Sequence, residues 1–92
     1  MAPLEHHDIT ARLEGRDWRL EDGAIVRDLE LEGFTAAIAA LNAVAELAEE
    51  ANHHPDLLVH GYKHLRVTLT THSEGGVTDH DLAMAERIDA TL

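Results

Sequence analysis

Histidine is the residue type that first suggests chemistry in this sequence, because eight of its 92 residues are histidines. An imidazole has an ordinary pKa of about 6.5, so it can both donate and accept a proton near neutral pH. Two of the eight, His53 and His54, are adjacent in the segment 49–55, which reads Glu-Glu-Ala-Asn-His-His-Pro. A third, His72, lies between a predicted strand and a Gly-Gly turn. Three imidazoles grouped with a carboxylate in this way are typical of general acid–base catalysis.

The predicted local structure places these histidines at the ends of elements, where functional sites commonly lie. Pro55 disfavours helical geometry at His54, so the preceding helix should end near His53. The negative end of the helix dipole favours protonated imidazoles there. Glu49, one turn earlier, can support the charge of His53 if the helix persists that far. The alternative for the histidine pair is a solvated helix end, and for His72 an exposed strand end. For Glu49 the alternative is an ordinary surface charge.

The remaining polar candidates carry weaker signals. Thr78 and Asp81 have the spacing of a capping pair at the start of a helix, and Asp81 can cap that helix and still face the site. His60 and His64 are four residues apart, which suits metal binding on a helix, but the strand pattern here opposes that interpretation. The sequence has no His-Glu-x-x-His motif, so we expect no metal site of that kind. The histidines expected at the surface are His6, His7 and His80.

The spacing of apolar residues predicts three helices and four strands. An Asp-Gly pair at 22–23 predicts a turn between the first two strands, and Gly61 predicts a turn between the last two. The predicted elements are a helix over 4–14, strands over 18–20 and 25–31, a helix over 34–52, strands over 57–60 and 62–71, and a helix from Asp79. Paired hairpins with helices on one face make an α+β two-layer sandwich with a four-stranded antiparallel sheet, in the order α-β-β-α-β-β-α.

Each predicted element presents one apolar face, and these faces together define the expected core. The residues expected to face inward are Ile25, Arg27, Leu29 and Leu31 in the second strand, Phe34, Ile38, Leu41, Ala45 and Ala48 in the long helix, Leu65, Val67, Leu69 and Thr71 in the last strand, and Leu82, Ala85 and Ile88 in the last helix. The alanines of the long helix favour helix formation and allow close approach to the sheet.

The overall composition limits the class of protein. The formal net charge is −11, and a negative field of this size repels phosphate backbones and anionic lipids, so we expect neither nucleic-acid nor membrane binding. The 45% of hydrophobic residues fall into periodic runs, which opposes disorder, and the absence of cysteine excludes disulfides and thiolate chemistry. No apolar run reaches the ~18 residues of a membrane span, and the first residues do not resemble a signal peptide. We therefore expect a cytoplasmic protein with a single domain over residues 1–92.

From about residue 16 to residue 90 the sequence resembles the pterin-4a-carbinolamine dehydratase family. Seven positions carry the resemblance, in the pattern Glu49-x3-His53-His54-Pro55-x6-Tyr62-x9-His72-x8-Asp81. Upstream, the similarity includes Trp18, the turn Asp22-Gly23-Ala24-Ile25 and Phe34. One position departs from the family: Leu57 stands two residues after the proline, where the family usually has an aromatic side chain.

The resemblance implies the dehydration of a 4a-hydroxytetrahydropterin to a quinonoid dihydropterin, a hydro-lyase reaction of tetrahydrobiopterin recycling. It implies no metal and no organic cofactor, because one proton is delivered to the departing hydroxyl and another is removed from the adjacent ring nitrogen. By position, His53 and His72 would be the acid–base groups, and Asp81 would orient a histidine. His54 would hold the pterin and share in proton transfer. The implied catalytic residues are thus His53, His54, His72 and Asp81, and the implied substrate-binding residues are His54, Pro55, Glu49 and Tyr62.

Two other classes of function stay open. The first is a non-catalytic binding or assembly protein, because the resemblance includes family members that act as coactivators or look like assembly factors. The second is a histidine-based metal-binding module. The intact set of histidines favours an enzyme over a non-catalytic binding or assembly protein. A domain of this size has a small core and open sheet edges, so we also expect a homodimer or homotetramer. The resemblance adds the pterin substrate and an aromatic amino-acid hydroxylase of the same pathway as partners.

Overall fold

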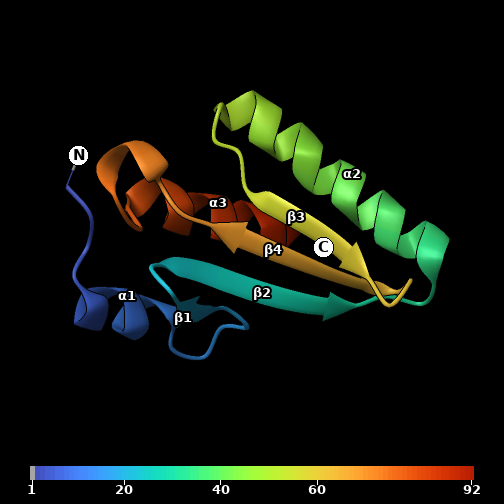
Figure 1. Ribbon diagram of the computed structural model, residues 1–92, viewed down its shortest axis with the longest axis horizontal. Coiled ribbons are helices and arrows are strands. Elements are labelled where there is room, and N and C mark those ends of the chain that lie inside the picture. Colours follow the sequence, from blue (N-terminus) through green and yellow to red (C-terminus); the bar gives the residue numbers. More distant parts are fainter. Residues whose placement is uncertain (1) are drawn as a thin grey trace.

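Three α-helices and a four-stranded sheet make up residues 2–92, the part of the chain that the computed structural model describes (Figure 1). In chain order the elements are α1 (His6–Leu13), β1 (Arg19–Glu21), β2 (Ala24–Glu30), α2 (Phe34–Ala51), β3 (Asp56–His60), β4 (His64–Leu69), the short 3₁₀ helix η1 (His72–Glu74) and α3 (Asp79–Thr91). The predicted α-β-β-α-β-β-α order and the α+β class are both confirmed.

Neighbouring strands of the sheet all run antiparallel, in the order β1-β2-β4-β3. β4 therefore lies inside the sheet, and β3 is one of its two edges. Asp56 of β3 lies opposite Thr68 of β4, so the residues just before β3 lie beside the residues just after β4. This register brings the end of α2 and the start of η1 to one end of the sheet, where Figure 1 shows α3 beginning as well.

One hydrophobic core lies between the sheet and the helices, and α1 joins it through Ile9 and Leu13. Six buried residues of β4 and α3 confirm the inward faces predicted for these two elements: Leu65, Val67, Leu69, Leu82, Ala85 and Ile88. Both elements that flank the predicted site are therefore fixed by the core.

The buried face of α2 differs from the predicted stripe. Its buried residues are Ala37, Ala40, Val44 and Ala48. Phe34, which begins the predicted stripe, is 56% exposed, so its predicted inward position is wrong. The larger Ile38 and Leu41 are only half-buried, along the side of the helix. Small side chains face the sheet because they let the helix approach it closely. In a thin core this close packing outweighs the burial of larger apolar side chains.

The turn between β3 and β4 is longer than predicted. β4 begins at His64, and Tyr62, predicted to start the strand, lies in the turn with a left-handed backbone (φ 55°). The preceding Gly61 has φ 54°, and two successive residues of this conformation reverse the chain tightly. Tyr62 therefore lies at the opposite end of the β3–β4 hairpin from the two adjacent histidines.

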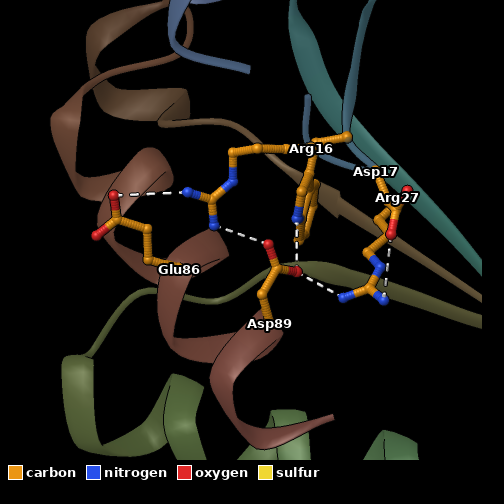
Figure 2. A network of polar contacts seen from close by, with 6 residues as sticks. Arg16, Asp17, Arg27, Glu86 and Asp89 are labelled. Carbon is orange, nitrogen blue, oxygen red and sulfur yellow. Dashed lines mark hydrogen bonds and ion pairs between the residues drawn. The ribbon is translucent and has the colours of Figure 1, made fainter. Parts of the chain in front are cut away.

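A polar network attaches α3 to β2 and to the segment before β1 (Figure 2). At its centre the Asp89 carboxylate accepts hydrogen bonds from Arg16 Nη2 at 2.8 Å, Trp18 Nε1 at 2.9 Å and Arg27 Nη1 at 2.5 Å. Burial alone would raise the pKa of the Asp89 carboxyl. The hydrogen bonds from Arg16 and Trp18, with the charge of Arg27, outweigh burial and hold that pKa below its ordinary value. The half-buried Arg27 on the inner side of β2 thus has a charged partner.

Candidate active site

The end of α2 positions His53. Asn52 adopts a left-handed conformation (φ 50°, ψ 44°), and the backbone N–H of His53 donates to the carbonyl of Ala48 at 3.1 Å. Together with the bond from the Asn52 N–H to the Glu49 carbonyl at 3.3 Å, this closes the helix as a Schellman motif. The helix therefore ends at Ala51, earlier than the predicted end near His53. The chain turns away from the helix axis before the two histidines.

His53 and Asp81 form a hydrogen-bonded pair at the inner side of the site. The Nε2 atom of His53 lies 2.5 Å from Oδ1 of Asp81, and the two side chains are 15% and 0% exposed. The other carboxylate oxygen accepts from the Thr71 hydroxyl at 2.8 Å and from the backbone N–H of Thr78 at 2.9 Å. Both oxygens are thus satisfied, as a buried carboxylate requires. Because Nε2 is engaged, Nδ1 is the nitrogen of His53 left for exchange with a ligand.

The predicted capping pair is present at the start of α3. Thr78 Oγ1 accepts from the backbone N–H of His80 at 3.2 Å, and Asp81 accepts in return from the backbone N–H of Thr78. This capping box satisfies backbone donors of the first turn, and the positive end of the helix dipole favours a carboxylate there. Asp81 therefore caps α3 and contacts His53 with the same side chain.

His54 and Glu49 make a second pair, which is exposed. His54 Nε2 lies 2.5 Å from Glu49 Oε2, and the His54 side chain is 57% exposed. The sequence predicts that Glu49 supports His53 if the helix continues that far, and the left-handed turn at Asn52 ends the helix before His53. Glu49 meets His54 instead. An ion pair this exposed to solvent contributes little to stability.

His72 lies at the same end of the sheet as His53 but does not contact it. It is the first residue of η1 and directly follows Thr71, whose hydroxyl donates to Asp81. In residues 2–92, no hydrogen bond or ring contact joins the side chain of His72 to that of His53 or His54. Its exposed side chain therefore flanks the buried pair without taking part in it.

Pro55 and Tyr62 stand at opposite ends of β3. Pro55 is half-buried and directly precedes the strand, whereas Tyr62 follows it in the turn to β4. Tyr62 is 62% exposed, and Lys63 Nζ lies 5.9 Å from the centre of its ring. A strand rises about 3.3 Å per residue, so the length of β3 separates Tyr62 from the histidines. Within one chain the structure does not bring Tyr62 into the site.

A cavity of about 210 Å³ lies between the end of α2 and α3. Its lining residues are Ala51, His53, His80, Ala83, Met84 and Arg87. His80 is exposed, as the sequence predicts, and its ring also contacts that of His53, with 6.0 Å between centroids and 85° between planes. Helical spacing is the signal that could have found it, because residues 80, 83, 84 and 87 recur on one face of α3. The site therefore includes a histidine outside the predicted set.

The side chains around the cavity supply proton donors and acceptors together with apolar surface. In the described part of the chain, no group of three or more His, Asp or Glu side chains could hold a metal ion. No helix in that part is both long and apolar enough to cross a membrane. The imidazoles and the guanidinium that line the cavity suit proton transfer and hydrogen bonding to a small polar ligand.

The fold and the site define a small α+β protein in which a buried histidine–aspartate pair borders a cavity. The chain belongs to the family described as pterin 4 alpha carbinolamine dehydratase, whose sequence profile matches residues 2–91. The family resemblance of the sequence is thereby confirmed.

Relatives span nearly the whole chain. A protein of Chloroflexus aggregans named "Putative pterin-4-alpha-carbinolamine dehydratase" is 48% identical over 94 residues, which cover 100% of this chain and 99% of the relative. A protein of the same name from Metallosphaera sedula is 43% identical over 90 residues, which cover 97% of this chain and 93% of the relative.

Two solved structures share the fold. The transcriptional coactivator/pterin dehydratase from Brucella melitensis is 33% identical, with a TM-score of 0.86 and 96% of each chain covered. A pterin dehydratase-like protein identified as a RuBisCO assembly factor in the alpha-carboxysome is 24% identical, with a TM-score of 0.67 over 83% of this chain and 89% of its own. The second likeness concerns the fold alone.

Proposed function

We propose that this protein is a hydro-lyase that dehydrates a 4a-hydroxytetrahydropterin to a quinonoid dihydropterin. The observation that carries the proposal is the pair of His53 and Asp81. A buried carboxylate holds one nitrogen of an imidazole, and the same imidazole forms part of the wall of a cavity. Membership of the family over residues 2–91 supports the choice of a pterin as substrate.

The reaction needs two proton transfers at neighbouring atoms. The bond between carbon 4a and its hydroxyl oxygen breaks as that oxygen gains a proton and leaves as water. A base removes the proton of the adjacent ring nitrogen as the carbon–nitrogen double bond forms. His53 can exchange protons at Nδ1 while Asp81 holds Nε2 and so fixes the tautomer, the role that a carboxylate has beside histidine in other enzymes.

The other histidines have supporting positions in this proposal. His54, exposed beside Glu49, holds the pterin and shares in proton transfer, and His72 acts as a second acid–base group from the end of β4. Pro55 contributes a rigid apolar contact next to them. Tyr62 has no role within the same chain, because it lies at the far end of β3.

A stopped-flow assay of 4a-hydroxytetrahydropterin dehydration tests the proposal. The wild-type protein should accelerate the loss of water above the rate in buffer, and His53→Ala should lower its rate by about 10²–10⁴-fold. His64→Ala is the matched control, because His64 also contacts an imidazole, that of His60 at 5.3 Å between centroids, but on the β3–β4 hairpin. It should keep the wild-type rate. A wild-type rate no higher than that in buffer would contradict the proposal.

A binding or assembly role on the same fold is the second candidate. The observation that favours it is that the Brucella melitensis relative is named as a transcriptional coactivator as well as a pterin dehydratase. The two candidates differ in their need for imidazoles. A folded triple variant, His53→Ala with His54→Ala and His72→Ala, should be inactive if the protein is an enzyme. An accelerated rate kept in that variant would exclude catalysis by these histidines, whereas rates at the buffer level in both proteins would support the binding role.

We also propose that the protein works as a homodimer or homotetramer in the cytoplasm. β1 and β3 are open edges, and Leu58 on β3 is 52% exposed, so pairing of edge strands between copies would cover both features. The pathway is tetrahydrobiopterin recycling, in which an aromatic amino-acid hydroxylase would supply the substrate. Sedimentation in moderate salt should show a multiple of the chain mass, and less association at low salt, where the charge of −11 is poorly screened. A single-chain species at micromolar concentration in moderate salt would contradict the assembly.

A further inference from the structure

His80 contacts the proposed acid–base group from the first turn of α3. Its ring and that of His53 are nearly perpendicular, at 85°, with 6.0 Å between their centroids. This edge-to-face geometry is attractive between aromatic rings, because the edge of one ring is positive and the face of the other is negative. His80 directly precedes Asp81, so two neighbouring residues of α3 contact the same imidazole.

The hydrogen bond to Asp81 does not by itself fix the plane of the His53 ring. A single bond at Nε2 restrains one atom, and the ring can still turn about its Cβ–Cγ bond within the range that this hydrogen bond tolerates. A second contact on another part of the ring removes this rotation, and precise sites depend on such supporting contacts. The ring of His80 is placed to supply it.

The backbone of His80 is held firmly, whereas its side chain has no other polar partner. Its N–H donates to Thr78 Oγ1 at 3.2 Å, and Thr78 is fully buried. Among the described residues, no hydrogen bond or ion pair involves the ring nitrogens of His80. His80 is an exposed residue, and its ring contacts that of His53 at the wall of the cavity.

The other charged groups near the cavity already have partners. Arg87 Nη2 binds Glu50 Oε1 at 3.0 Å, and Glu49 binds His54 at 2.5 Å. Neither carboxylate is paired with His53. The hydrogen bond with Asp81 and the ring contact with His80, both from the first turn of α3, are therefore the interactions that can orient the imidazole.

We propose that His80 is a positioning residue, whose ring holds the plane of the His53 imidazole so that Nδ1 stays turned toward the cavity. The inference rests on the proposed function, which gives His53 its part in proton transfer. A positioning role requires the shape of the His80 ring and not its nitrogen atoms. This requirement distinguishes it from a proton relay, in which the nitrogens are essential.

Two substitutions separate the ring from its nitrogens. His80→Ala removes the ring and should lower kcat about tenfold with KM within about twofold, since misplacing a catalytic group by about 1 Å can cost up to 100-fold. His80→Phe keeps the edge contact and should bring kcat back to within about threefold of the wild-type value. His64→Ala, which loses a histidine–histidine contact away from the cavity, should leave both constants unchanged. If His80→Phe is as slow as His80→Ala, or if KM alone changes, the positioning role is overturned.

Nitrogen-15 NMR of the His53 ring tests the positioning role of His80 without an activity assay. The wild-type protein and His80→Phe should show one tautomer with the proton on Nε2. In His80→Ala a ring that turns out of its hydrogen bond with Asp81 should show the averaged signals of both tautomers. Unchanged His53 signals in His80→Ala would overturn the positioning role even in an active enzyme. An inactive wild-type protein that shows the expected signals would contradict the proposed function and still support the positioning of His53. Thermal melts establish that each variant is folded.

Discussion

His53 and His54 differ in whether their carboxylate partners depend on them for a hydrogen bond. The Asp81 carboxylate is fully buried, so the bond from His53 satisfies an acceptor that water cannot reach. The Glu49 carboxylate lies in solvent, so water replaces His54 as soon as that side chain is removed. Truncation of the two neighbours should therefore have very different effects on folding, although both belong to the proposed site.

His53→Ala should lower the free energy of unfolding by about 1–3 kcal/mol, the cost of leaving a buried acceptor without a partner. His54→Ala and His72→Ala remove exposed side chains and should each change it by less than about 0.5 kcal/mol. Urea denaturation of the three variants measures the difference. Equal midpoints for all three would mean that the bond to Asp81 adds nothing to stability.

At the scale of elements, patterns of residues close in the chain predict where turns and helices begin. The Asp-Gly pair at 22–23 predicts the first hairpin, and the spacing of Thr78 and Asp81 predicts the start of α3; both are confirmed. The end of α2 was predicted less well. Pro55 indicates that the helix must stop, but the left-handed turn at Asn52 stops it sooner and changes which histidine meets Glu49.

The sequence predicts that Asp81 orients a histidine, but which histidine it contacts, and that His80 contacts the same ring, depend on residues far apart in the chain. His53 follows α2, whereas His80 and Asp81 belong to α3, and only the sheet register brings these elements to one end of the molecule. Asp81 was found because a capping pattern and a family motif both include it. His80 belongs to neither pattern. Helical spacing places it on the face of α3 that also carries residues 83, 84 and 87, but its contact with His53 is seen only in three dimensions.

The turn at Asn52 gives a prediction at this scale. Asn52→Ala should cost about 1 kcal/mol, because a left-handed backbone is unfavourable for alanine, whereas Asn52→Gly should be neutral or stabilising. Asn52→Ala should also slow dehydration, since extending α2 would move His53 away from Asp81. Thermal melts and the stopped-flow assay measure the two effects. A larger loss of stability in Asn52→Gly than in Asn52→Ala would contradict this account of the helix end.

At the scale of the whole molecule, the Asp89 network makes stability depend on acid pH. The pKa of the Asp89 carboxyl is lowered in the folded protein, so folding favours its charged form. Its contribution is therefore fully present above the unfolded-state value of about 4, and it is lost as the pH falls through the lower folded-state value. Because this carboxylate attaches α3 to the segment before β1 and to β2, acid should loosen those attachments first.

Asp89→Asn tests this pH dependence. At pH 7 the variant should be less stable than the wild-type protein by about 1.5–3 kcal/mol, the range for hydrogen bonds to charged groups. Below about pH 4 this difference should shrink, because the carboxyl of the unfolded wild-type protein is protonated first and that of the folded protein follows at lower pH. Asp28, whose pKa is also lowered by a hydrogen bond from Arg66, is present in both proteins, so its contribution cancels. Urea midpoints between pH 3 and pH 7 give the difference, and a constant value across that range would contradict the prediction.

The Asp81 side chain both caps α3 and binds His53, and this double role has an evolutionary consequence. A descendant that lost catalysis would still need this carboxylate, because it caps α3 and satisfies Thr71 and Thr78. Selection for folding alone would therefore retain it, so an aspartate at this position does not distinguish an enzyme from a scaffold. The exposed His54 and His72 are different, because no buried group depends on them. A lineage that keeps the aspartate and loses those two imidazoles is expected to have lost catalytic activity and to have kept a binding role.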